Sequence, residues 1–320
     1  MNELTKKLSL MGIVPVIVIN DAKNALPLAK ALIEGGLPCA EVTFRTAAAK
    51  DAIKAMSEAY PEMIIGAGTI LTPEQADTAI EAGAKFIVTP GLNPEVVKHC
   101  LAKGYPIVPG INNPSGIEQA MSLGLDTVKF FPAENSGGVA MLKAMSGPYG
   151  AISFMPTGGI GNNNLKDYLA FNKIFCVGGG WVASAAQIAA CDFDGIKHNV
   201  EEAVRTMLDF KVVHIGVNSE NESAALETAN TLKAAFGFET DERTKSYFAS
   251  TQVEVMKAKG MGTFGHIAIG TSNVDRAVYH LERKGFEFDY DTATYAPDGS
   301  MKFIYLKKEI GGFAYHLVKA

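Results

Sequence analysis

The feature that most constrains the fold of this chain is a regular alternation of short apolar runs and helix-like segments between residues 12 and 181. The apolar runs predict strands at 12–19, 39–45, 63–70, 86–91, 106–111, 127–132, 153–159 and 174–181. A last helical pattern follows near 192–210. Because alternation of strand and helix implies a parallel sheet, and eight repeats are the number that closes one, the pattern predicts an α/β fold, a (β/α)8 barrel of the TIM type.

From residue 211 the pattern changes to an internal duplication. The segment "VVHIGVNSENESAALETANTLKAAFGFET" resembles "FGHIAIGTSNVDRAVYHLERKGFEFD" further along the chain, and the histidines His214 and His266 are 52 positions apart. Each copy has a strand, a polar turn, an amphipathic helix and then strand-like runs. We therefore expect an α+β domain of two βαβββ units. The predicted domains are 1–209 for the barrel and 210–320 for the second domain.

Composition excludes several classes of protein. The net charge of −5 offers no basic field for nucleic acid, and no apolar run reaches the ~18 residues of a membrane span. The first ten residues, "MNELTKKLSL", predict a short amphipathic helix rather than a signal peptide. The four cysteines show no C-x-x-C spacing, which favours a reduced, cytoplasmic setting. We expect neither nucleic acid nor a membrane as a partner.

A lysine inside an apolar strand, Lys129 in "TVKFFP", is the first candidate for chemistry, because an unpaired ammonium is costly to bury. Alternation along the second strand places Glu41 and Arg45 on the inner face, and "GAGT" brings Thr69 to the end of the third. Active sites of such barrels lie at these strand ends. Three plainer interpretations stay open: a lysine that extends to solvent, a structural ion pair at the rim, and glycine pairs that are only turns.

This set of side chains suits a class I aldolase that acts on a 2-oxo acid and needs no cofactor. A neutral lysine amine attacks a ketone to form a Schiff base, whose protonated imine withdraws electrons so that a C–C bond breaks or forms. Glu41 is placed to move protons, while Arg45 and Thr69 are placed to hold a carboxylate. The runs "PTGG" and "VGGG" leave bare backbone suited to a phosphate.

Several motifs together resemble the 2-keto-3-deoxy-6-phosphogluconate / 4-hydroxy-2-oxoglutarate aldolase family, colinearly over about 1–209. They are "GIVPVIVI", "EVTFRT", "GAGTILTPEQ", "TPGLNPEV", "VKFFPAENSGG", "PTGGI" and "VGGGW". The resemblance implies a homotrimeric barrel. It also implies cleavage of the phosphorylated sugar acid to pyruvate and glyceraldehyde 3-phosphate, or of 4-hydroxy-2-oxoglutarate to pyruvate and glyoxylate.

The resemblance also assigns roles to residues. It makes Lys129 the Schiff-base residue and Glu41 the acid/base. It assigns substrate binding to Arg45, Thr69, Pro90, Phe131, Thr157, Gly158, Gly159, Gly179 and Gly180. One position departs from the family. Members that prefer the gluconate-derived phosphate usually have serine at this position, where the chain has Gly180. A lost hydroxyl donor puts the phosphate preference in doubt, and a related substrate such as the phosphogalactonate stays open.

The second domain resembles the vicinal oxygen chelate (glyoxalase/bleomycin-resistance) superfamily. In its metal-binding members the ligands come from the first and last strands of each unit, which here offer His214, Glu254, His266 and His316. Three imidazoles and a carboxylate suit Zn²⁺, Ni²⁺, Fe²⁺ or Mn²⁺. Three functions remain: an aldolase with an accessory domain, a bifunctional enzyme with a metal-dependent isomerase, epimerase or dioxygenase activity, and a non-catalytic sugar-acid sensor. The intact set of Lys129, Glu41 and Arg45 argues against the sensor.

Overall fold

A computed structural model describes residues 2–320 of the chain and divides it into two units, Met1–Met207 and Leu208–Ala320. The sequence predicts a boundary after residue 209.

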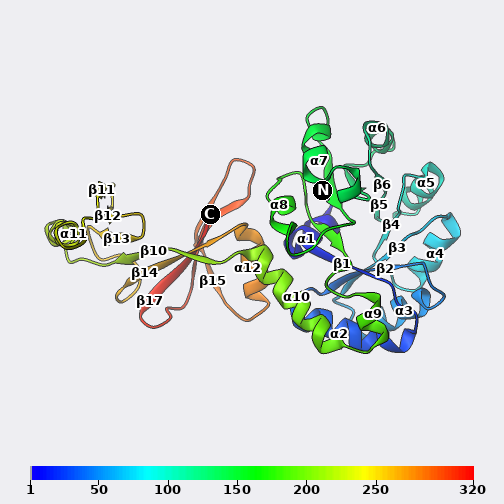
Figure 1. Ribbon diagram of the computed structural model, residues 1–320, viewed down its shortest axis with the longest axis horizontal. Coiled ribbons are helices and arrows are strands. Elements are labelled where there is room, and N and C mark those ends of the chain that lie inside the picture. The colour runs from blue at the N-terminus through cyan, green and yellow to red at the C-terminus, as the bar shows by residue number, and fades with distance from the viewer. Residues whose placement is uncertain (1) are drawn as a thin grey trace. The chain divides into compact units, whose positions relative to one another are not determined.

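The strands of the first unit form one curled parallel sheet (Figure 1). Six strands pair in the order β5-β4-β3-β2-β1-β9 and three in the order β6-β7-β8. Strands β5 and β6 are two parts of one extended segment that Pro109 interrupts. Proline has no N–H to donate to a ladder, so the pairing breaks at this residue. A parallel bridge between Thr157 and Gly178 then joins the end of β8 to β9. The bounds are β1 Ile13–Ile17, β2 Cys39–Thr43, β3 Ile64–Gly68, β4 Phe86–Val88, β5 Ile107–Val108, β6 Gly110–Ile111, β7 Thr127–Phe130, β8 Ser153–Pro156 and β9 Val177–Gly179.

Helices follow the strands, and local sequence sets where several begin. In α4, α5 and α6 the first residue is proline, and the residue before it caps the helix with its side chain. Proline suits this position because its missing N–H has no partner inside the helix. The bounds are α1 Glu3–Met11, α2 Ala25–Gly35, α3 Ala49–Ala59, α4 Pro73–Glu81, α5 Pro94–Ala102, α6 Pro114–Ser122, α7 Gly138–Ser146, α8 Leu165–Leu169, α9 Ala185–Ala189 and α10 Phe193–Leu208, with 3-10 turns η1 Ala22–Asn24 and η2 Glu134–Ser136.

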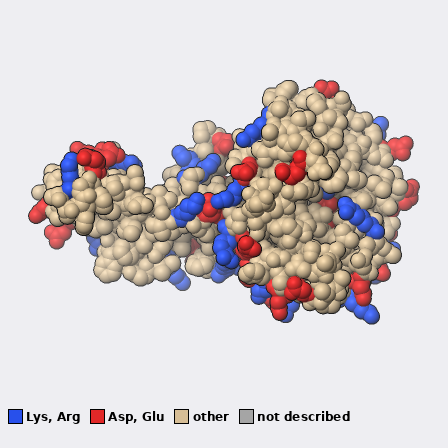
Figure 2. Space-filling model, in the orientation of Figure 1, with Lys and Arg blue, Asp and Glu red and all other residues tan. Residues whose placement is uncertain are grey.

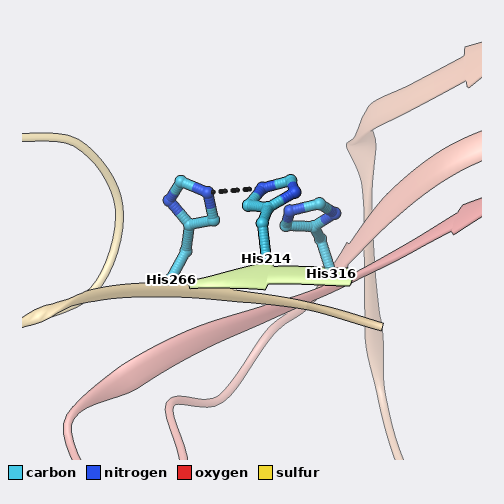
Figure 3. Close-up of side chains that lie close together, drawn as sticks. All are labelled: His214, His266 and His316. Atoms are coloured by element: carbon cyan, nitrogen blue, oxygen red, sulfur yellow. Dashed lines mark hydrogen bonds between the residues drawn. The ribbon is translucent and has the colours of Figure 1, made fainter. Parts of the chain in front are cut away.

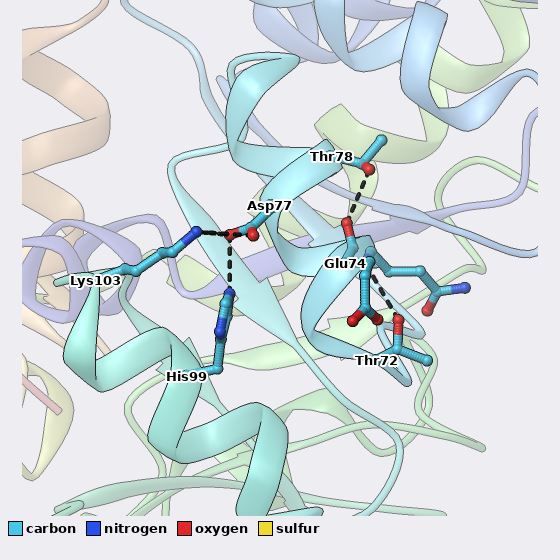
Figure 4. A network of polar contacts seen from close by, with 7 residues as sticks. Thr72, Glu74, Asp77, Thr78, His99 and Lys103 are labelled. Carbon is cyan, nitrogen blue, oxygen red and sulfur yellow. Dashed lines mark hydrogen bonds and ion pairs between the residues drawn. The ribbon is translucent and has the colours of Figure 1, made fainter.

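A polar network ties the outer surfaces of α4 and α5 together (Figure 4). Asp77 accepts hydrogen bonds from Lys103 at 2.7 and 2.8 Å and lies 2.9 Å from His99 Nε2. The hydrogen bonds from Lys103 and then from His99 lower the pKa of Asp77. His99 is therefore a partly exposed member of an ion network, with a side chain 25% exposed.

The second unit is an eight-stranded mixed sheet in the order β11-β12-β13-β10-β14-β17-β16-β15. Its element order is strand, helix and three strands, twice over. The first copy is β10 Lys211–Val217, α11 Glu222–Phe236, β11 Thr240–Glu242, β12 Ser246–Ala249 and β13 Val253–Met256; the second is β14 Gly265–Thr271, α12 Val274–Glu282, β15 Phe288–Tyr295, β16 Met301–Leu306 and β17 Phe313–Lys319. The copies meet at the centre, where β10 and β14 pair antiparallel.

Each of these two central strands also pairs in parallel with the last strand of its own copy, β10 with β13 and β14 with β17. Helix α11 packs Ala225 and Ala229 against Tyr247 and Val255. The four strands β13, β10, β14 and β17 therefore lie side by side at the middle of the sheet, which brings the first and last strands of both copies together.

Charged side chains of both signs are interspersed on the face shown in Figure 2, in keeping with a net charge of only −5. Among residues 2–320, no helix combines the length and the apolar character needed to cross a membrane.

Candidate functional sites

Lys129 and Glu41 form a buried ion pair inside the curled sheet. Lys129 Nζ, from β7, lies 3.1 and 3.4 Å from the two carboxylate oxygens of Glu41, from β2. Their side chains are 6% and 1% exposed. The ammonium also lies 5.4 Å from the centroid of the Phe131 ring, where the quadrupole of the ring attracts a cation. Lys129 is therefore paired inside the sheet rather than extended to solvent.

A glycine on the neighbouring strand makes room for this carboxylate. Gly68 closes β3, and a Cβ at this position would lie 2.2 Å from Glu41 Oε1. A side chain here would force the carboxylate out of its position beside Lys129. Sequence reasoning used "GAGT" only to place Thr69 and missed Gly68, although the glycine stood in the same motif.

Arg45 lies beside Thr69, as the sequence predicts, but it does so from a turn and not from the predicted strand. The strand expected over 39–45 ends at Thr43, and the exposed Arg45 lies in the turn that follows, so strand alternation does not position it. Its Nε instead donates a 3.2 Å hydrogen bond to Thr69 Oγ1. Thr69 adopts a φ of 58°, a left-handed conformation that is rare for a β-branched residue. Arg45 and Thr69 are thus brought together at the ends of β2 and β3.

Pro90 and Phe131 line one cavity, of about 570 Å³, beyond the ends of β4, β6 and β7. Asn112 and Asn113 supply amide groups to the same wall. Apolar surface with a few polar groups is the ordinary lining of a small-molecule site.

The glycine run after β8 is fixed against the loop that follows β7. Gly158 and Gly159 have φ values of 101° and 80°, which other residues rarely adopt. The N–H of Ala133 donates to Thr157 O at 2.8 Å, and that of Glu134 donates to Gly158 O at 3.1 Å. Within residues 2–320, the buried Thr157 Oγ1 has no hydrogen-bond partner. An unsatisfied buried hydroxyl beside two glycines suits a polar ligand.

Trp181 shapes the end of β9. A Cβ on Gly179 would lie 1.9 Å from the Trp181 ring, so glycine is required there. A Cβ on Gly180 would meet only Val16 O, at 3.3 Å, so a serine fits there once its neighbour moves by a few tenths of an ångström. There is thus room for a hydroxyl-bearing side chain at position 180, although this chain has glycine there.

Three histidines of the second unit converge on one side of the sheet (Figure 3). His214 from β10, His266 from β14 and His316 from β17 place one ring nitrogen each within 4.8 Å of one another. Glu254 from β13 completes the cluster, with its Oε2 3.2 Å from His214 Nε2 and 3.1 Å from His266 Nε2. The structure therefore brings the four predicted ligand residues together.

Electrostatics within this cluster favour a neutral imidazole and an ionised carboxylate. Although burial opposes the charge of Glu254, hydrogen bonds from His214, His266 and Ser246 hold the pKa of its carboxyl well below the ordinary value. Burial, then the nearby His266 and His214, lowers the pKa of His316 to about 3. Ser246 Oγ donates to Glu254 Oε1 at 2.6 Å, a supporting contact that the sequence did not indicate.

The donor set fits a divalent cation. Ligand atoms at about 2.1 Å around a tetrahedral Zn²⁺ lie about 3.4 Å apart, close to the separations of 3.1–3.2 Å seen among His214, His266 and Glu254. The buried Nδ1 of His316 has no hydrogen-bond partner among residues 2–320. Metal ligands must be neutral imidazoles and carboxylates, the forms that the lowered pKa values of His316 and Glu254 favour for these two residues.

A buried lysine–carboxylate pair inside a curled parallel sheet, with an arginine and glycine loops at its strand ends, is the arrangement expected of a Schiff-base aldolase. The family described as KDPG and KHG aldolase matches residues 4–199, more than half of the chain. The chain belongs to the KDPG and KHG aldolase family, and it is a carbon–carbon lyase.

Individual relatives agree with this assignment. The chain is 48% identical over 202 residues to the 2-dehydro-3-deoxy-phosphogluconate aldolase of Haemophilus influenzae. The matched residues make up 63% of this chain and 95% of that protein. It is 45% identical to the KHG/KDPG aldolase of Escherichia coli, over 60% of this chain and 90% of that protein.

A solved structure agrees too. The KDPG aldolase of Legionella pneumophila, with pyruvate captured as a covalent carbinolamine intermediate, superposes with a TM-score of 0.61 at 35% identity, over 63% of this chain and 98% of that one.

Proposed function

We propose that the first unit is a (β/α)8 barrel that cleaves 2-keto-3-deoxy-6-phosphogluconate to pyruvate and glyceraldehyde 3-phosphate, 4-hydroxy-2-oxoglutarate to pyruvate and glyoxylate, or both. The observation that carries the proposal is the 3.1 Å contact between Lys129 Nζ and Glu41 Oε1 in a buried setting. The named activities of the Haemophilus influenzae and Escherichia coli relatives support the substrates.

In the proposed mechanism Glu41 takes a proton from Lys129, and the free amine attacks the 2-keto carbon of the substrate. Glu41 returns the proton to the departing hydroxyl, so that water leaves and a protonated imine remains. Glu41, ionised again, takes the proton of the C4 hydroxyl as the C3–C4 bond breaks; the aldehyde leaves, and the electron pair stays on the enamine. Glu41 returns this proton to C3 of the enamine, and hydrolysis of the imine releases pyruvate and restores Lys129.

Binding groups surround this reaction. In the proposal, Arg45 and Thr69 hold the carboxylate that becomes that of pyruvate, and Pro90 and Phe131 line the pocket. The backbone beside Thr157, Gly158, Gly159, Gly179 and Gly180 takes the phosphate. Because Gly180 supplies no hydroxyl, phosphate binding rests on the backbone N–H groups and Thr157, and a phosphogalactonate-type substrate remains the alternative.

Borohydride trapping with pyruvate tests the Schiff base directly. We expect one covalent label, at Lys129. Lys129→Ala should abolish both label and cleavage, and Lys129→Arg should not restore them because a guanidinium does not form the imine. The exposed Lys98 provides a control, and Lys98→Ala should label and cleave as the unchanged protein does. A label elsewhere, or none, contradicts the aldolase mechanism.

A second candidate function, a metal-dependent isomerase, epimerase or dioxygenase activity of a vicinal oxygen chelate domain, is favoured by the convergence of four ligand side chains. His214, Glu254, His266 and His316 would hold a Zn²⁺, Ni²⁺, Fe²⁺ or Mn²⁺ ion, which supplies Lewis acidity when bound. Accessory binding without a second reaction is the other interpretation of this unit.

Metal analysis and melting test this candidate. A chelator should lower the melting temperature of the second unit, because a ligand that binds only the folded state stabilises it. His266→Ala should remove that sensitivity, while aldolase turnover survives. A protein that purifies without metal, and whose melting does not respond to any of the four ions, contradicts the metal site.

We also propose a homotrimer formed through the barrel and a cytoplasmic location. The family resemblance supports the first, and four cysteines that form no disulfide within residues 2–320 support the second. Sedimentation equilibrium of the full chain tests the trimer, and a single species of monomer mass contradicts it.

A further inference from the structure

The histidine cluster of the second unit lies in the wall of a cavity of about 710 Å³, and the composition of that wall indicates what the cavity takes. Besides the four cluster residues, the lining includes two aromatic rings, two methionines and three lysines. These residues are Phe303, Tyr305, Met256, Met261, Lys245, Lys257 and Lys259. The cavity therefore offers apolar surface and an excess of positive charge.

Two of the three lysines are available to a ligand. Lys257 is already neutralised, because its Nζ lies 2.9 Å from Glu222 and 2.6 Å from Glu242. Neither Lys245 nor Lys259 has an ion pair or a side-chain hydrogen bond within residues 2–320, and both are exposed. The ammonium groups of these two lysines therefore have no protein partner to displace.

The charge balance of the lining favours an anion. Glu254 is the only carboxylate among the lining residues, and the histidine cluster occupies it. Lys245 and Lys259 bring two ammonium groups to the wall that contact no carboxylate of the lining, and a bound divalent cation adds further positive charge there. Wall charge of one sign in a concave site concentrates small ions of the opposite sign.

The aromatic part of the lining limits the rest of the ligand. The Phe303 and Tyr305 rings lie 4.5 and 5.0 Å, centroid to centroid, from His316, so apolar surface stands directly beside the cluster. Such a surface packs against carbon rather than a second charged group.

We propose that the cavity of the second unit binds a small organic anion, with its charged group selected by Lys245 and Lys259 and its carbon skeleton against Phe303 and Tyr305. This proposal rests on the proposed metal site, which forms the inner end of the cavity. It places the ligand in the chemical class of the carboxylates that the aldolase reaction releases.

The test uses the full-length protein loaded with Co²⁺, whose visible spectrum reports on the metal site alone, so that pyruvate bound in the barrel does not contribute. The probes are pyruvate and glyoxylate, with pyruvamide as the uncharged isostere of pyruvate. We expect both anions to change the spectrum, and pyruvamide to require a concentration at least about tenfold higher, as expected from the loss of an ionic contact.

Variants assign the selectivity to the two lysines. Lys245→Met with Lys259→Met should raise the half-saturating pyruvate concentration roughly tenfold and leave that of pyruvamide unchanged. Arginine at both positions should restore binding. Lys308→Met, an exposed lysine of the same unit outside the cavity, is the matched control and should have no effect.

The outcomes separate this proposal from the metal site. If Co²⁺ gives no ligand-field spectrum, the metal site fails and the anion proposal falls with it. If the spectrum forms but neither anion changes it, the anion proposal alone is wrong. Equal affinity for pyruvate and pyruvamide, or no effect of the two lysine substitutions, overturns the role of Lys245 and Lys259.

Discussion

Replacement of Gly68 by alanine should separate the folding of the first unit from its chemistry. The backbone of Gly68 has no positive φ, so alanine is tolerated there by the main chain. Its Cβ, however, would lie 2.2 Å from Glu41 Oε1 and 2.7 Å from Glu41 Cγ. Ordinary contact begins at 3.4 Å, so the carboxylate must retreat by the difference, about 1.2 Å.

The retreat acts on the contact between Glu41 and Lys129. Their separation of 3.1 Å would grow by as much as this amount, to at most about 4.3 Å, which is too long for direct proton transfer. A misplacement of about 1 Å in a catalytic pair costs roughly 100-fold in rate, whereas one extra methyl in a packed core costs about 1–3 kcal/mol of stability. We expect kcat for cleavage to fall about 100-fold in a protein that still folds.

Steady-state cleavage with either substrate, thermal melting and borohydride trapping together measure this effect. Trapping should still label Lys129, though more slowly, because its amine is unchanged. Gly150→Ala provides the matched control, since a Cβ there meets nothing within 4 Å, and it should cleave normally. A folded Gly68→Ala protein with kcat within about threefold of the unchanged protein would refute the role given to the Glu41–Lys129 contact.

Three further predictions concern other parts of the chain. Gly180→Ser should lower KM for the phosphorylated substrate, through a new hydrogen bond of roughly 1.5–3 kcal/mol, and leave KM for 4-hydroxy-2-oxoglutarate unchanged; equal effects on both would show that the position does not face the phosphate. Gly216→Ala should weaken metal binding at least about tenfold by equilibrium dialysis, with aldolase turnover unaltered, because its Cβ would lie 2.0 Å from the His266 ring; undiminished affinity contradicts this. Because hydrogen bonding to Lys103 lowers the folded-state pKa of Asp77 below 3.8, its stabilisation is present above that pH and lost as the pH falls through the lower folded value, so the melting-temperature difference between the unchanged protein and Asp77→Asn should be seen at pH 7 and vanish in acid. A melting-temperature difference of the same size at pH 7 and in acid would mean that the charge of Asp77 contributes nothing to stability.

The predicted curled parallel sheet follows from a signal that is strong in this chain. Each apolar run in the first 181 residues contains a strand, because buried parallel strands need continuous apolar sequence and the segments between them have helical periodicity. The same reasoning put Lys129 and Glu41 at one place, since inner-face residues of a curled sheet converge however far apart they are in the chain.

Other features depend on geometry that no local pattern carries. The end of β2 at Thr43, two residues before the predicted end, changed how Arg45 is positioned, and boundaries of this kind depend on tertiary contacts. Gly68 is required because a particular atom of Glu41 comes close to it. Ser246 supports Glu254 across two neighbouring antiparallel strands. Such contacts join residues whose proximity appears only once the sheet is assembled.

The central pairing of β10 with β14 makes the two copies of the second unit inseparable. Removal of either copy would leave one of these strands as a bare sheet edge, which tends to pair with other chains, and would discard half of the histidine–carboxylate cluster. The second copy is thus not redundant. Each copy covers the sheet edge of the other and contributes half of the histidine–carboxylate cluster. A substitution in one copy therefore affects both. The sequences of the two copies can diverge only where the change preserves the pairing of β10 with β14 and the shared cluster.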